Sequence, residues 1–157
     1  MSRETVESAL RSLAEQRGYA GAGLDADGCA VFEHENGIGM LVVYVPEGPG
    51  AVALYAELGP AVDPPAVFRL ALEAMHLWSR AGELTLGVLP DTDILTASAL
   101  LPVDEDLSEQ LGPAIDRFAD RAMHWARLAQ AIDEPDEDGT PKDGDADPAG
   151  GFPKIMG

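Results

Sequence analysis

Residues 23–45 read GLDADGCAVFEHENGIGMLVVYV, and this stretch decides the fold class. It holds two apolar runs, Cys29 to His34 and Ile38 to Val45, separated by Glu35-Asn36-Gly37. That separator and the preceding Asp25-Ala26-Asp27-Gly28 are tight-turn sequences, because Asn and Gly accept the positive φ that hairpin turns require. The stretch therefore predicts neighbouring strands that pair antiparallel.

Further strands are predicted on both sides of this hairpin. A short run around Leu24 and the run Ala51 to Glu57 indicate one strand before it and one after it. Glu83 to Leu89 and Asp93 to Leu101 indicate two more strands around the turn Pro90-Asp91-Thr92. We therefore expect three or four strands in the first half of the chain and two in the second.

Three segments have helical apolar periodicity. Ser2 to Arg17 begins with Ser2 as a candidate N-cap, and Pro64 to Arg80 follows Asp63, a second candidate cap. A long final helix repeats apolar residues every three or four positions from Leu107 to Ile132. The order is then α-β-β-β(-β)-α-β-β-α. Because hairpin turns join the strands, we expect an α+β fold, an antiparallel twisted sheet with three helices.

Charge and composition narrow the possible partners. The 157 residues include 28 Asp and Glu against 10 Lys and Arg, a formal net charge of −18. Such acidity disfavours nucleic acid and anionic membrane surfaces, both of which bind through Lys and Arg. One cysteine, Cys29, cannot form an internal disulfide, and no window approaches the roughly 18 apolar residues of a membrane span. We expect a cytoplasmic protein whose partners are proteins, cations or small molecules.

The acidity also divides the chain. Residues 133–157 hold eight carboxylates and two lysines, a net charge of −6, in sequence rich in Pro, Gly and Asp. We expect an α+β domain over residues 1–132 and an acidic disordered tail over 133–157, because the tail has too little apolar surface to offset its ordering entropy. The apolar cluster of Phe152, Pro153, Ile155 and Met156 either docks or belongs to a frayed terminus, and the frayed terminus is favoured.

The sequence contains no recognisable catalytic, cofactor-binding or metal-binding pattern. No phosphate-binding loop is present, and His34, His76 and His124 are too far apart in sequence to suggest a zinc site. His34 is expected to be an exposed strand residue, and Cys29 a small buried hydrophobe. Asp25 to Gly28 is read as a hairpin turn, because Cys29 occupies the position of the third oxygen ligand of a calcium loop. We therefore expect no cofactor and no enzymatic activity.

The segment from Pro64 to Arg80 has a second apolar stripe that one small domain would leave exposed. This stripe predicts a homodimer whose interface contains Phe68, Leu72, Met75 and Trp78.

The layout as a whole resembles a known family. ETVESALRSLAEQRG (4–18), the hairpin, AVALYAELG (51–59), VFRLALEAMHLW (67–78), GELTLGVLPDTDILTASALLPVD (82–104) and DRFADRAMHWARLAQAI (116–132) together resemble the class I chaperones of bacterial type III secretion, the Tir-chaperone family. The resemblance covers about residues 2–132. It implies a dimeric cytoplasmic protein without ATPase activity that binds the N-terminal region of a secreted effector and keeps it soluble and extended. The long Asp-rich tail departs from the family pattern.

The resemblance also implies a binding surface near the first helix and the hairpin strands. We expect the effector segment to contact Leu10, Leu24, Val31, Phe32, Met40 and Val42. The equally favoured alternative is that most of these residues belong to the hydrophobic core. The secretion machinery is a further candidate partner. Two other functions stay open: a small α+β enzyme or ligand-binding protein with an unrecognised site, and a general adaptor or regulator on the same fold.

Overall fold

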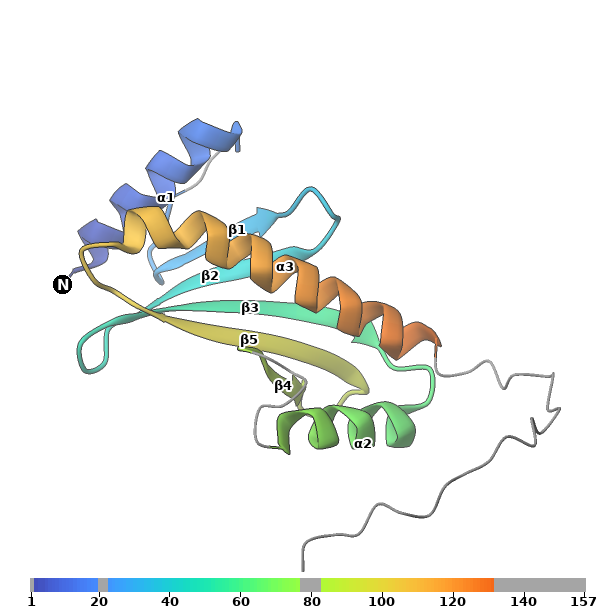
Figure 1. The fold of residues 1–157 in the computed structure, drawn as a ribbon. Coiled ribbons are helices and arrows are strands. Elements are labelled where there is room, and N and C mark those ends of the chain that lie inside the picture. Colours follow the sequence, from blue (N-terminus) through green and yellow to red (C-terminus); the bar gives the residue numbers. More distant parts are fainter. Residues whose placement is uncertain (1, 20–22, 77–82, 132–157) are drawn as a thin grey trace, which may run out of the picture.

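The computed structural model describes residues 2–19, 23–76 and 83–131 (Figure 1). The elements follow the order α1 (Arg3–Arg17), β1 (Cys29–Glu33), β2 (Gly39–Val45), β3 (Ala51–Pro60), α2 (Pro64–Met75), β4 (Thr85–Val88), β5 (Ile94–Pro102) and α3 (Leu107–Ala131). The strands form one antiparallel sheet in the order β1-β2-β3-β5-β4. The predicted α+β class is thereby confirmed. The optional strand around Leu24 is not formed, because Leu24 lies directly before the turn that leads into β1.

Both predicted hairpin turns adopt the geometry that their residues favour. The Asp25 carboxylate accepts hydrogen bonds from the backbone N–H groups of Asp27 and Cys29, each at 2.9 Å. Gly28 and Gly37 have φ values of +81° and +91°, a region that side chains with a Cβ rarely adopt. The Glu35–Gly37 turn joins β1 to β2 and fixes the register in which Val31 faces Leu41, whereas the Asp25–Gly28 turn leads into β1 without a paired strand before it.

The core lies between the sheet and the helices, and all three helices supply buried residues to it. Helix α3 runs across one face of the sheet, and α1 packs against α3 (Figure 1). Leu54 of β3 and Leu111 and Ile115 of α3 are almost completely buried. Each such side chain contributes about 1.5–3 kcal/mol relative to its exposed state. We call the sheet face that packs against α3 the inner face and the opposite face the outer face.

Some element ends differ from the predicted ones. Asp63 caps α2 as expected, accepting a hydrogen bond from the Ala66 N–H at 3.3 Å, whereas the Ser2 side chain makes no capping bond to α1. Helix α2 ends at Met75, where His76 adopts an extended backbone conformation, and the remainder of the predicted helix, residues 77–80, lies outside the described residues. Strand β3 extends to Pro60, three residues beyond its predicted end at Glu57.

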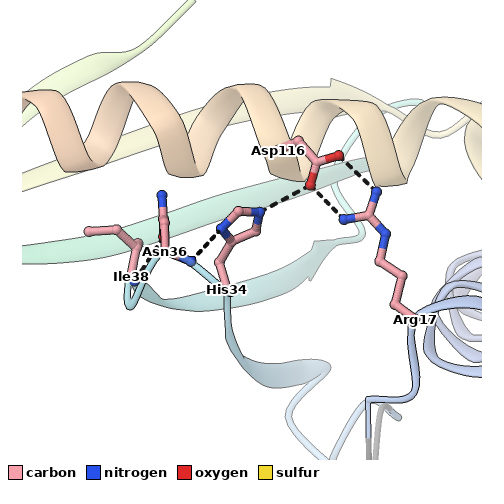
Figure 2. A network of polar contacts seen from close by, with 5 residues as sticks. All are labelled: Arg17, His34, Asn36, Ile38 and Asp116. Carbon is pink, nitrogen blue, oxygen red and sulfur yellow. Dashed lines mark hydrogen bonds and ion pairs between the residues drawn. The ribbon is translucent and has the colours of Figure 1, made fainter.

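A polar network joins α1, the hairpin and α3 (Figure 2). Both Arg17 guanidinium N–H groups donate to the Asp116 carboxylate, at 2.5 and 2.8 Å, and His34 Nε2 lies 3.1 Å from the same carboxylate. His34 Nδ1 accepts a hydrogen bond from the Asn36 backbone N–H at 3.2 Å. This nitrogen is therefore unprotonated, so Nε2 carries the proton that is donated to Asp116. The prediction of an exposed His34 is wrong, since only 6% of the residue is accessible.

The Arg17 guanidinium, helped by the His34 hydrogen bond, lowers the pKa of Asp116 to about 2 against the opposing effect of partial burial. The network therefore connects elements that are 99 residues apart in sequence through an ionised carboxylate.

None of the described helices is long and apolar enough to cross a bilayer.

Candidate functional site

The outer face of the sheet carries two parallel rows of mainly apolar side chains. The strand registers align Val31, Leu41, Tyr55 and Ser98 in one row, and Cys29, Val43, Ala53 and Leu100 in the next. Alternate residues of a strand point to opposite faces, so these rows lie opposite the side chains that pack against α3. Because the rows cross β1, β2, β3 and β5, they form a continuous apolar surface.

Much of this surface is accessible to solvent. Val31 is 79% exposed and Leu100 is 72% exposed, while Leu41, Val43 and Tyr55 are partly exposed. Isolated exposed apolar residues are ordinary, but a contiguous set across four strands is typical of a surface that binds another protein.

A hollow of about 300 Å³ lies at the β1 end of this surface. Val31, Leu41 and Tyr55 supply side chains to it, Glu57 lies at its margin, and Gly39 leaves space where another residue would place a Cβ. Partial burial, with the Glu57 carboxylate as a secondary cause, raises the pKa of the Tyr55 hydroxyl. The hollow thus combines apolar walls with a neutral hydroxyl donor and a carboxylate acceptor. It suits an apolar side chain on a peptide whose backbone needs hydrogen-bond partners.

Strand β1 is an edge of the sheet, and its outward backbone groups are open to a further strand. The Tyr44 N–H donates to the Gly28 carbonyl and the His34 N–H donates to the Ile38 carbonyl, so even-numbered residues of this segment bond to β2. In an antiparallel ladder the intervening residues direct their N–H and C=O groups away from the partner. The Asp25 turn occupies these groups at Cys29, which leaves those of Val31 and Glu33 for an added strand.

The six residues predicted to bind an effector occupy different environments. Val31 lies on the outer face, and Leu24 is half-buried against the core. Four residues are core residues, with exposures of 0–5%: Leu10, Phe32, Met40 and Val42. The strand residues among the four point to the inner face, opposite Val31, so they are not accessible on a single chain. Their role in binding stays a prediction, and their positions correspond to the alternative of a core role.

The predicted dimer residues on α2 are likewise divided. Leu72 is 73% exposed, whereas Phe68 and Met75 are partly buried against the core. The Leu86 N–H of β4 contacts the Met75 sulfur at 3.4 Å, which shows why Met75 faces inward. Trp78 lies outside the described residues. The homodimer itself stays a prediction.

The binding surface predicted from the sequence does not include Leu41, Tyr55 and Leu100. Their alternation with buried neighbours was visible in the sequence, but the alignment of Val31 with Leu41 and Tyr55 depends on register across three strands. A one-residue change in register would move every one of these side chains to the other face.

Comparison with solved structures identifies similar folds. A chain of the ExsC–ExsE complex matches with a TM-score of 0.69 and 21% identity, over 81% of this chain and 95% of that chain. A chain of the HopA1–SchA chaperone–effector complex matches with a TM-score of 0.59 and 16% identity, over 83% and 96%. A chain of the heterodimeric ExoU–SpcU complex from the type III secretion system of Pseudomonas aeruginosa matches with a TM-score of 0.50 and 21% identity, over 77% and 94%.

At these identities the likeness establishes a shared fold, which extends over nearly the whole of each matched chain. No family model and no curated protein matches the sequence.

Proposed function

We propose that this protein is a type III secretion chaperone that binds the N-terminal region of an effector in the bacterial cytoplasm and keeps it soluble and partly extended. The observation that carries the proposal is the exposed apolar row Val31, Leu41 and Tyr55 beside the open β1 edge. The fold shared with chains of a chaperone–effector complex and of a type III secretion complex supports it. The resemblance of the sequence favours the class I, Tir-chaperone type.

The geometry suggests how an extended segment would bind. Its backbone would pair with the N–H and C=O groups of Val31 and Glu33 as a sixth strand of the sheet. Alternate side chains of an added strand project to one face, so one of them would enter the hollow between Val31 and Tyr55. Main-chain bonds would supply affinity with little sequence preference, and the hollow would select an apolar side chain.

The proposal includes a homodimer formed through α2 and β4. Leu72 on α2 and Val88 on β4 are exposed by 73% and 40%, and α2 packs against β4. Strand β4 is the second edge of the sheet and has only four residues. A partner chain would therefore bury an apolar helix face and shield this edge at once. The net charge of −18 favours solubility of the loaded complex.

Coexpression with the N-terminal segment of a secreted protein encoded beside this chain tests the proposed function. The chaperone predicts a stable complex that copurifies and survives gel filtration. Capture of the folded remainder of that protein, without its N-terminal segment, would instead support the adaptor alternative.

A matched pair of variants locates the interaction. Gly39→Lys places a side chain in the hollow at a position where a new Cβ meets no atom within 4 Å, so the fold is preserved while binding falls. Val62→Lys changes another exposed valine, 41% accessible and outside the hollow, and leaves binding unchanged. An equal loss of binding in both variants, or no loss of binding in either, would contradict the assigned surface.

A further inference from the structure

A second hollow lies on the inner face, between β5 and α3. Its lining is mixed: apolar side chains, among them those of Leu54, Ala99, Leu101, Ala114 and Phe118, lie beside charged ones, and its volume is about 200 Å³. We call it the β5–α3 groove. On α3, Gly112 faces α1, since a Cβ there would contact Leu13 and Arg17, whereas Arg121 lines the groove. Successive helical residues are rotated by about 100°, so Gly112 and Arg121, which are nine positions apart, lie on opposite sides of α3. The groove is therefore on the side of α3 that faces away from α1.

Positive charge is concentrated at the margin of this groove. Arg117 and Arg121 line it together with Glu83. The Arg117 guanidinium lies 3.8 Å from the Glu83 carboxylate, and both side chains are more than half exposed, so this ion pair is weak. In the described parts of the chain, no carboxylate lies within ion-pair distance of Arg121. A segment with carboxylates beside apolar side chains would therefore complement the groove.

We infer that the β5–α3 groove receives the C-terminal segment of this same chain. Residues 152–156 include Phe152, Ile155 and Met156, which match the apolar part of the lining, and residues 143–147 include three carboxylates, which match Arg117 and Arg121. The rest of the tail is acidic and polar, so this apolar cluster is its one part suited to the walls.

Chain length permits this contact. Helix α3 ends at Ala131, and a helix rises about 1.5 Å per residue, so Arg121 and Arg117 lie about 15 and 21 Å back along the helix. A Gly-rich chain of roughly 20 residues has a root-mean-square reach of about 25 Å. Residues 132–151 are therefore long enough to bring residues 152–156 to the groove. Because the segment is tethered to the domain, its effective concentration at the groove is on the order of millimolar.

The docked C-terminal segment is then an internal ligand, and a second protein must displace it before binding in this groove. The groove shares only Leu100 with the outer-face rows and shares no lining residue with the outer hollow, so this inference stands independently of the proposed function.

Limited trypsin digestion of the full chain tests the contact. Lys154 lies inside the docking segment, and Lys142 directly precedes the docking carboxylates, so cleavage at Lys154 is measured against an added reference peptide. Docking predicts that Arg117→Gln/Arg121→Gln raises the ratio of Lys154 cleavage to cleavage of the reference peptide severalfold, and that high salt does the same in the unaltered chain. Arg127→Gln, an exposed arginine of α3 outside the groove, is the matched control and leaves the ratio unchanged. An unchanged ratio in the double variant overturns the inference.

Backbone amide chemical shifts provide a measurement that does not depend on the arginine variants. Phe152→Ala/Ile155→Ala/Met156→Ala in the full chain should shift the amides of Ala99, Leu101 and Ala114 and leave those of the outer face unchanged. Shifts that persist on dilution support contact within one chain. Absence of these shifts overturns the inference. Shifts that disappear on dilution also overturn it and show instead that the tail of a second copy occupies the groove.

Discussion

Adjacent residues Val31 and Phe32 of β1 should respond to substitution in opposite ways. Val31 points to the outer face and is 79% exposed, whereas Phe32 points to the inner face, is 5% exposed and contacts Tyr19 edge to face at 5.7 Å between ring centroids. Phe32→Ala removes a buried aromatic ring and leaves a cavity, which costs about 3–5 kcal/mol. Since whole domains are stable by only about 5–15 kcal/mol, this is a large fraction of the total.

Val31→Lys removes almost no buried surface, and lysine is well tolerated on an edge strand. Its expected effect on the free energy of unfolding is within about 0.5 kcal/mol. If Val31 is buried by a bound segment, the same change costs about 1.5–3 kcal/mol of binding, a loss of affinity of roughly 10- to 150-fold.

Urea denaturation of both variants measures the stabilities, and titration with the effector N-terminal segment measures the affinities. The assigned faces predict that Phe32→Ala is destabilised and that Val31→Lys is stable but weak in binding. A loss of more than about 2 kcal/mol of stability in Val31→Lys, far above the value usual for a surface position, would refute the assignment of Val31 to the outer face. Unchanged affinity in that variant would refute its role in binding.

Three further changes test other parts of the structure. Asp116→Asn should reduce stability near neutral pH. Because the folded pKa of about 2 lies below the usual 3.8, the difference from the unaltered chain should be full above about pH 4 and shrink toward pH 2, as acid-dependent melting would record. Leu72→Asp should convert the proposed dimer into monomer or aggregate, and light scattering of the unaltered chain at 16.5 kDa would contradict the dimer. Removal of residues 133–157 should lower the melting temperature by less than about 5 °C, because the tail has no apolar periodicity and adds few apolar side chains to the fold; a larger fall would show that it is part of the folded domain.

The hairpin turns and strand alternation made the fold predictable from sequence. Asp25 to Gly28 and Glu35 to Gly37 carry local turn signals, and the periodicity between Leu107 and Ala131 marks α3, so each of these elements follows from nearby residues. Such signals act over a few positions and do not depend on the remainder of the chain.

The candidate site was less predictable because it depends on contacts distant in sequence. Alternation places Val31 and Phe32 on opposite faces, but it does not say which face α3 covers. The burial of His34 depends on Asp116, which is 82 residues away, and no local pattern indicates that contact. The same limit explains why the predicted surface includes core residues such as Met40 and Val42 together with Val31.

The proposed function requires that an extended segment binds along β1 and over the outer face. Hydrogen–deuterium exchange of the protein, alone and in complex with the effector N-terminal segment, tests it directly, because added-strand hydrogen bonds protect edge amides from exchange. We predict that binding slows exchange at the amides of Val31 and Glu33, whose N–H groups point away from β2, and leaves exchange in α2 unchanged. Slower exchange confined to α2 and β4, with β1 unaffected, would contradict the account.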